Sequence, residues 1–294
     1  MLFKYLAPER TDILDNLRIR FTQPAALNDP FESRPRFTLE DEVGHLASAA
    51  FEEMDEELRA FLDQDDLSAT ERDEARQLVQ RTKAEISDRL SADEARGQPD
   101  LVEGLGRIIN QSIGVLSLSK CPDNLQMWAH YGDQHQGFVI GLDEGNDFFH
   151  LSTSEGAHSD PRPVIYHSHR ETLRPDGDIC DALLCTKSLE WSHEQEVRVL
   201  RVLAGACSRH RADALGHPVV LFDLPAEAIG EVILGARSSP ATIDRVQRAL
   251  QNSALANVQI KRASVSFTEY ALELKPFELE AGASIHGDRI KGLK

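Results

Sequence analysis

Residues 38–103 constrain the fold more than any other part of the chain, because they concentrate its negative charge in a helical pattern. The segment holds 20 Asp and Glu residues against 7 Lys and Arg, a net charge of −13 out of −17 for the whole chain. Its apolar residues recur every three or four positions, as in amphipathic helices. We expect helices over residues 43–62, from Ser68 or Thr70 to Leu90, and over residues 101–109.

The acidic residues fill the outer faces of these expected helices. The segment is therefore interpreted as a solvated helical insert, and the alternative is a docking surface for a basic partner. The rest of the chain holds 29 acidic and 25 basic residues, a net charge of −4. The total charge argues against a basic surface for duplex nucleic acid. The nearly neutral remainder still permits a positively lined pocket for an anionic ligand.

Outside the insert, short segments alternate apolar and polar residues as half-buried strands do. Strands are expected at residues 2–6, 17–22, 112–118, 137–142, 163–167, 195–203, 219–223, 231–234 and 258–264, with one more near Leu272. Helices are expected at residues 124–131, 179–187 and 241–252, the first opened by a capping box of Asp123 and Gln126. This pattern predicts an α+β fold with a mixed or antiparallel β core.

The helical segment interrupts this β pattern, which defines the expected domains. We expect one core domain of residues 1–36 plus 109–278, an acidic helical insert of residues 37–108, and a flexible tail of residues 279–294.

Several features bear on compartment and metal binding. No run reaches the ~20 apolar residues of a membrane span, and the first residues lack the pattern of a signal peptide. The four cysteines, Cys121, Cys180, Cys185 and Cys207, form no CxxC pair and have no zinc-ligand spacing. We expect a cytoplasmic protein with reduced thiols, no membrane partner and no metal site.

Two polar clusters lie beside expected strands in the first half of the chain. Asn28 and Asp29 precede Pro30, which favours an extended residue before it, and Phe31 and Glu32 follow. This string is equally typical of a plain turn. Further on, Ser117 and Ser119 are two residues apart, so in a strand their hydroxyls share a face.

Two further clusters carry candidate ligand-binding groups. The expected helix at residues 124–131 ends in His130 and Tyr131, whose polar atoms can reach a ligand. Glu194 and Glu196 flank one residue at the start of a strand, and Arg198 shares their face and can hold one carboxylate ionised. A charged strand end on the surface is the alternative. Phosphate loops, GxSxG and HExxH motifs are missing from the sequence.

These strings, in this order, resemble a bacterial family known as domain of unknown function 2971. The resemblance rests on residues 3–5, 21–24, 28–32, 127–132, 137–142, 187–198 and 231–235. It spans most of the chain apart from the insert and the tail, and it carries no activity.

A second resemblance, to the ADP-ribosyltransferase superfamily, does imply an activity. Such enzymes carry a polar or basic group on a first strand, hydroxyls on a second, and a Glu at the start of a later strand. Here Lys4 or Tyr5, then Ser117 and Ser119, then Glu194 and Glu196 follow that order. Lys4 and Tyr5 stand where an Arg or His is usual, and Leu118 stands where many members have Thr.

That resemblance implies a split β-sheet and NAD as the substrate, with ADP-ribose transferred to a protein or nucleic acid, in bacterial defence or as a toxin. It implies Glu196 as the catalytic carboxylate and Glu194 as the assisting acid, with Tyr131 or Phe31 stacking on nicotinamide or adenine. The expected NAD-contacting residues are Tyr5, Asn28, Asp29, Phe31, Ser117, Ser119, His130, Tyr131 and Arg198.

Two other functions fit the same residues. The first is a non-catalytic nucleotide-sensing or interaction module that uses the same pocket. The second is a hydrolase or nuclease that holds a divalent metal with carboxylates, for which the sequence offers Asp29, Glu32, Glu194 and Glu196. The spacing of these carboxylates matches no recognised metal motif.

Overall fold

The fold comes from a computed structural model of the chain. It describes residues 1–32, 40–63, 67–93, 99–152, 158–169, 179–203, 206, 208–213 and 216–278. The expected tail of residues 279–294 lies outside the described residues.

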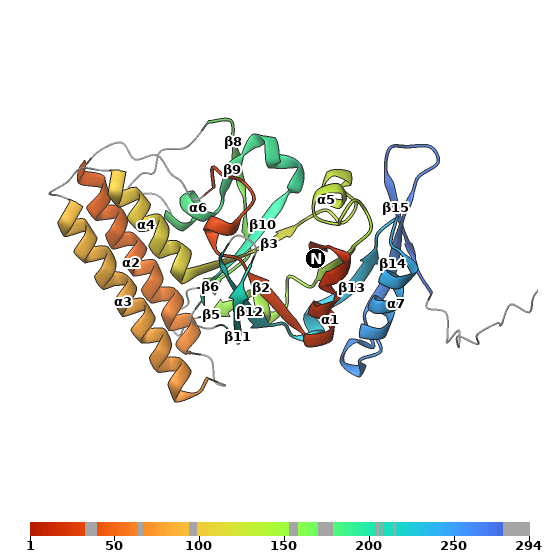
Figure 1. The fold of residues 1–294 in the computed structure, drawn as a ribbon, viewed down its shortest axis with the longest axis horizontal. Helices are drawn as coiled ribbons and strands as arrows, with labels where there is room; N and C mark the ends of the chain where they lie inside the picture. Colours follow the sequence, from red (N-terminus) through yellow and green to blue (C-terminus); the bar gives the residue numbers. More distant parts are fainter. Residues whose placement is uncertain are drawn as a thin grey trace, which may run out of the picture.

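A mixed eight-stranded sheet forms the centre of the molecule (Figure 1). Its order is β15-β14-β13-β4-β1-β3-β10-β7, and every neighbouring pair is antiparallel except β13 and β14. The strands are β1 (Leu2–Leu6), β3 (Ile113–Ser119), β4 (Phe138–Leu142), β7 (Arg162–Pro163), β10 (Glu196–Val202), β13 (Ile229–Leu234), β14 (Gln259–Val265) and β15 (Leu272–Pro276). The prediction of an α+β fold with a mixed, largely antiparallel sheet is confirmed.

A smaller three-stranded sheet packs against one face of the central sheet. It has the order β11-β12-β2, with β2 at Arg18–Phe21, β11 at Ser208–Ala212 and β12 at Pro218–Asp223. The sequence analysis did not predict β11. Two short pairs complete the β structure: β5 (Leu151–Ser152) with β6 (His158–Ser159), and β8 (Ile165–His167) with β9 (Thr186–Ser188).

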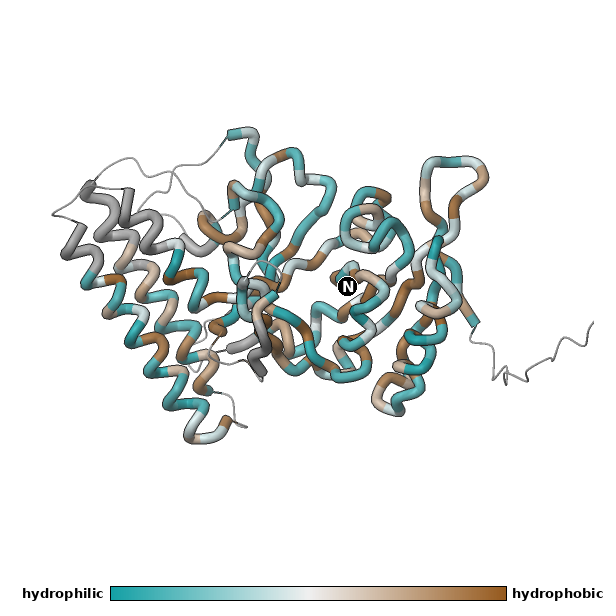
Figure 2. Tube along the Cα trace, viewed as in Figure 1, coloured by the Kyte–Doolittle hydropathy of each residue, from teal (hydrophilic) through white to brown (hydrophobic). Residues whose placement is uncertain are grey.

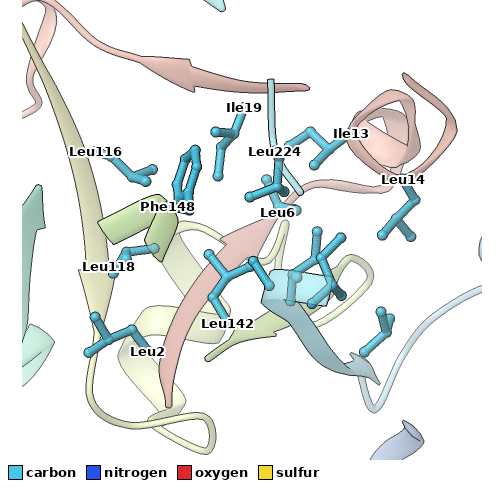
Figure 3. Close-up of a cluster of buried hydrophobic side chains, with 14 of the residues drawn as sticks. Leu2, Leu6, Ile13, Leu14, Ile19, Leu116, Leu118, Leu142, Phe148 and Leu224 are labelled. Carbon is cyan, nitrogen blue, oxygen red and sulfur yellow. The ribbon is translucent and has the colours of Figure 1, made fainter. Parts of the chain in front are cut away.

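The main hydrophobic core lies between the two sheets (Figure 3). Leu116 and Leu118 of β3 meet Ile19 of β2 and Phe148 there, and Leu116 is fully buried. A second cluster covers the other face, where Trp128 packs on Phe3 and Tyr5. Because alternate residues of a strand point to opposite faces, both faces of β1 are buried.

Short helices connect and cover the strands. They are α1 (Asp12–Asn16), α5 (Leu125–His130), α6 (Ile179–Leu184) and α7 (Pro240–Ala249), with 3₁₀ turns η1 (Pro8–Thr11), η2 (Pro24–Ala26), η3 (Asp147–Phe149), η4 (Leu189–Glu194), η6 (Ala226–Ala228) and η7 (Ser253–Leu255). The helix α7 makes the crossover that the parallel pair β13–β14 requires. Its N-terminus is capped by the Ser239 hydroxyl, with Pro240 in the first turn.

The acidic insert forms three long helices that lie side by side at one end of the molecule (Figure 1). They are α2 (Glu40–Leu62), α3 (Ala69–Asp93) and α4 (Pro99–Ser112). Figure 2 shows hydrophilic residues along them, interrupted by hydrophobic ones. The buried residues form a separate small core of Ala47, Met54, Val79, Ile86 and Ile108. The predicted helices of the insert are thus confirmed.

The insert is connected to the strands through a continuous helix–strand junction and through an ion pair. The helix α4 runs to Ser112 and directly into β3, so the expected boundary at residue 108 falls inside a helix. Glu53 of α2 lies 3.3 Å from the Arg162 guanidinium of β7. Burial raises the pKa of nearby Glu57 to about 7, although the charge of Arg162 opposes this. None of the helices in the described part of the chain is long and apolar enough to cross a membrane.

Local predictions were wrong at three places. The N-cap of α5 is Asn124, whose side chain accepts from the backbone N–H groups of Gln126 and Met127, and not Asp123. The expected helix at residues 179–187 stops at Leu184, and the remainder forms β9. The expected strand at residues 163–167 divides between two sheets as β7 and β8.

One close approach in the fold is directly testable. A Cβ on Gly137 would lie 1.9 Å from the carbonyl oxygen of Leu6, which is backbone and cannot move aside. We expect Gly137→Ala to lower the free energy of unfolding by about 3 kcal/mol. In α4, a Cβ on Gly106 meets nothing within 4 Å. Gly106→Ala is therefore expected to raise that free energy by up to about 1 kcal/mol. Urea unfolding of both variants measures this; equal effects would contradict it.

Candidate functional site

The strands β1 and β3 pair at one position and then separate. Phe3 is opposite Ser119, and this is the one register pair between them in the described chain. Beyond it, the Lys4 ammonium donates to the Ser117 carbonyl at 2.9 Å. Two residues further along β3, Thr22 occupies the edge in place of β1. Its backbone forms two hydrogen bonds of 2.8 Å with the backbone of Val115. The sheet is therefore split where Lys4 replaces a ladder hydrogen bond.

A cavity of about 210 Å³ lies at this split. Residues of β1 and β3 line it, together with side chains from η2, α5, β9, η4 and β10. The lining residues are Phe3, Lys4, Tyr5, Thr22, Ala26, Leu27, Asn28, Ser117, Leu118, Ser119, Met127, Tyr131, Lys187, Glu194 and Glu196.

A left-handed residue places the two glutamates at the cavity. Glu194 ends η4, Gln195 has φ of 44°, and Glu196 starts β10. The Ser119 hydroxyl donates to the backbone carbonyl of Glu194 at 2.7 Å, which ties the turn to β3. Ser119 of β3 pairs with Phe3 of β1 on one side and with Glu196 of β10 on the other. These three residues therefore lie side by side across the sheet.

Five buried ionisable groups meet at the cavity, and we call Glu32, Lys187, Glu194, Glu196 and Arg198 the ion cluster. Lys187, Glu194 and Glu196 line the cavity, and Glu32 and Arg198 lie behind them. The Lys187 ammonium lies 2.6 Å from Glu194, 3.1 Å from Glu32 and 3.3 Å from Glu196. The Arg198 guanidinium lies 2.8 Å from Glu196 and 2.7 Å from Glu32. All five side chains are at most 5% exposed.

The ion cluster sets the ionisation of its members. Burial alone would raise the pKa of Glu196, but the charge and hydrogen bonds of Arg198, with Lys187 and the Ser117 hydroxyl, lower it to about 2. Burial would likewise lower the pKa of Lys187, but the three glutamates raise it above its usual value. Glu196 is therefore a carboxylate, and Lys187 an ammonium, at neutral pH.

A hydrogen-bonded chain links Asn28, Tyr131 and Glu194, which all line the cavity. The Asn28 amide donates to the Tyr131 hydroxyl, which donates to Glu194 at 2.6 Å. Burial and the charge of Glu194 raise the pKa of Tyr131, so its hydroxyl keeps its proton. On the other side, burial lowers the pKa of Lys4 to about 8, although the charge of Glu196 opposes this.

The structure gathers most of the expected site residues. Seven line the cavity: Tyr5, Asn28, Ser117, Ser119, Tyr131, Glu194 and Glu196. The Tyr5 hydroxyl is already used, because it donates to the Cys121 carbonyl at 2.7 Å. Arg198 lies behind the cavity, where it holds Glu196 and Glu32.

Besides Arg198, three further expected contact residues are not in the cavity lining. Asp29 is buried, and one of its oxygens accepts from the Phe31 backbone N–H at 2.9 Å. The ring of Phe31 is 62% exposed, and His130 is exposed with its ring against Tyr131. Asp29 and Phe31 therefore shape the turn that carries Asn28, and Tyr131 is the aromatic residue that reaches the cavity.

Sequence reasoning missed Lys187 as a site residue. Its ammonium contacts three glutamates and lies 4.8 Å from the centre of the Trp191 ring. A single Lys in a short strand carries no motif, and Lys187 entered only as part of residues 187–198, which resemble the family of unknown function. The sequence offers Glu32 as a metal ligand, whereas the structure places it in the ion cluster.

The ion cluster is a poor donor set for a divalent metal. Three of the four carboxylates considered for that role already form ion pairs with Lys187 or Arg198. A metal ion would have to displace a buried ammonium or guanidinium. Among the described residues, no group of three or more His, Cys, Asp or Glu is arranged to hold a metal ion.

Comparison with known proteins gives a match to a family model. Residues 127–199 match the model of a family described as protein of unknown function (DUF2971). The matched segment runs from α5 to β10 and so contains Tyr131, Lys187, Glu194, Glu196 and Arg198. This supports the resemblance to that family for the site residues that lie between residues 127 and 199. No curated protein and no solved structure matches the chain, so none of these comparisons points to an ADP-ribosyltransferase.

The lowered pKa of Glu196 makes the stability of the protein depend on pH. A carboxyl whose pKa falls from 4.5 to about 2 on folding contributes about 3 kcal/mol at neutral pH. That contribution is complete above pH 4.5 and is lost as the pH falls towards 2. Glu196→Gln should therefore be less stable than the wild type at pH 7 by about 3 kcal/mol, and the difference should shrink by pH 3.

Urea unfolding at pH 7, 4.5 and 3 measures that difference. Glu273→Gln is the matched control, since Glu273 forms an exposed pair with Lys275 and should matter little. A gap between wild type and Glu196→Gln that stays constant down to pH 3 would contradict the assigned ionisation.

Proposed function

We propose that the protein is an ADP-ribosyltransferase-like enzyme that cleaves NAD at the cavity between β1 and β3. One observation carries the proposal. The three strands expected to bear the polar group, the hydroxyls and the glutamate are neighbours in the sheet, and their residues line one cavity. Nothing in the spacing along the chain required this, because more than 70 residues separate Ser119 from Glu194.

The state of Glu196 suits the chemistry. When the bond from ribose C1 to the nicotinamide nitrogen breaks, both electrons leave with nicotinamide and positive charge develops on the ribose. A fixed carboxylate in a site that excludes water stabilises such a centre strongly. Glu196 is ionised at neutral pH and is held in place by Arg198. An acceptor oxygen or nitrogen then bonds to C1 and loses its proton.

The size and lining of the cavity suit one end of the dinucleotide. About 210 Å³ is less than the ~300–1,000 Å³ of sites that enclose a whole drug-sized ligand. The nicotinamide and its ribose would occupy the cavity, with Tyr131 as the aromatic neighbour of the ring. The remainder of NAD would extend outwards past Asn28, and Lys4 would supply positive charge within the cavity.

The test is release of nicotinamide from NAD by the purified protein, with and without a cell lysate that supplies acceptors. We expect Glu196→Asp to lower the release rate at least ~100-fold, because it keeps the charge but withdraws the carboxylate by one methylene. Glu190→Gln is the control, since Glu190 lies exposed on η4 outside the cavity. It should leave the rate unchanged.

Two outcomes would overturn the proposal. One is a wild-type protein that binds NAD, seen as a thermal shift lost in Glu196→Asp, but releases no nicotinamide under either condition. That result would instead support the non-catalytic nucleotide-sensing module. The other is a folded protein that neither binds nor cleaves NAD.

A further inference from the structure

A second cavity, of about 500 Å³, lies beside the β14–β15 hairpin and separate from the site above. Leu125 of α5 lines this cavity, whereas Met127 and Tyr131 of the same helical segment line the other. The rest of its lining comes from His135, Ala236, Arg237 and residues 265–272 of the hairpin.

The hairpin turn beside this cavity carries unusually exposed apolar side chains. Phe267 and Tyr270 are 101% and 103% exposed, and Val265 is 68% exposed. The turn projects from the body of the protein (Figure 1). It is held by a hydrogen bond of 3.0 Å from the Ser266 N–H to the Ala271 carbonyl. Clustered exposed apolar residues of this kind mark contact surfaces in soluble proteins.

The opposite wall of the cavity is built into the fold. Asp133, Gln134 and His135 are three successive residues with positive φ, which places His135 on the wall. Its ring stacks on Trp128, and its carbonyl accepts from the Arg237 backbone N–H at 2.9 Å. The surface therefore combines a preformed cavity with projecting aromatic side chains.

The charges around the cavity are self-complementary. Arg237 and Glu269 both line it, and neither forms an ion pair with any residue in the described parts of the chain. In a two-fold dimer the same patch is used by both subunits, so a group on one side meets its opposite on the other. A nucleic acid fits less well, because Arg237 is the one permanent cation among these lining residues.

We propose that this surface binds a second copy of the chain. Phe267 and Tyr270 of each subunit insert into the cavity of the other, and Arg237 of each pairs with Glu269 of its partner. Large aromatic side chains bury roughly 150–250 Å² each, so the four rings would bury roughly 600–1,000 Å². A stable interface buries about 1,200–2,000 Å² in total. Leu125 and Val265 add apolar area around the rings.

Sedimentation velocity of the full chain, from about 1 to about 100 μM, tests the proposal. The wild type should show a concentration-dependent dimer. Phe267→Ser and Tyr270→Ser should each weaken it at least roughly 30-fold, as expected for central aromatic contacts. Ile165→Ser is the control, since Ile165 is likewise an exposed apolar residue, at 50%, but lies outside both cavities. Both ring variants should keep the wild-type circular dichroism spectrum.

The proposed contact between Arg237 and Glu269 provides an independent test. Arg237→Glu and Glu269→Arg should each weaken the dimer, because each places like charges opposite one another across the two-fold axis. The variant that carries both changes should restore it. A wild type that is monomeric at about 100 μM, or a dimer that withstands both ring substitutions, would overturn the proposal. Failure of the double charge reversal to restore the dimer would overturn the assigned Arg237–Glu269 contact.

Discussion

The pairing of three glutamates with two cations inside the core domain governs where the site residues lie. Removing an ion from water costs several kcal/mol, so buried charges persist only when each finds partners. Arg198 of β10 reaches Glu32, which is 166 residues away in the chain. Lys187 of β9 also pairs with Glu32, so β9 lies against the same carboxylate. The ion cluster therefore fixes the turn after η2, the strand β9 and the start of β10 against one another, and it leaves Glu194 and Glu196 facing the cavity.

The split of the sheet is the second constraint, and it supplies the space that the charged groups face. A continuous β1–β3 ladder would fill the gap with backbone hydrogen bonds. Instead the Lys4 ammonium satisfies one carbonyl of β3, and Thr22 satisfies the backbone of Val115. Buried backbone polar groups require hydrogen-bond partners. These contacts supply such partners without closing the β1–β3 ladder. NAD cleavage at this split, as proposed, would combine an opened sheet with a carboxylate that stays ionised.

Sequence pattern predicted what depends on local periodicity. The alternating strands and the amphipathic insert follow from the two-residue and 3.6-residue periods, and Glu194 and Glu196 follow from their place at a strand start. It did not reveal contacts between distant segments, such as those that bring Glu32 and Lys187 together. It also misjudged competition within short strings: Asn124 outcompetes Asp123 as the N-cap of α5. At the end of that helix, Tyr131 reaches the cavity whereas His130 stays exposed.

Arg198 and Lys187 keep Glu196 ionised in a buried site that faces the cavity, and the rest of the account depends on this. Carbon-13 NMR of the glutamate side-chain carboxyl carbons, with the Glu196 resonance assigned from Glu196→Gln, follows its protonation directly. We expect this resonance to stay at the carboxylate position from pH 7 down to pH 3.5, because the pKa of Glu196 is about 2. A resonance that titrates with a midpoint near the ordinary glutamate value of about 4.3 would contradict it.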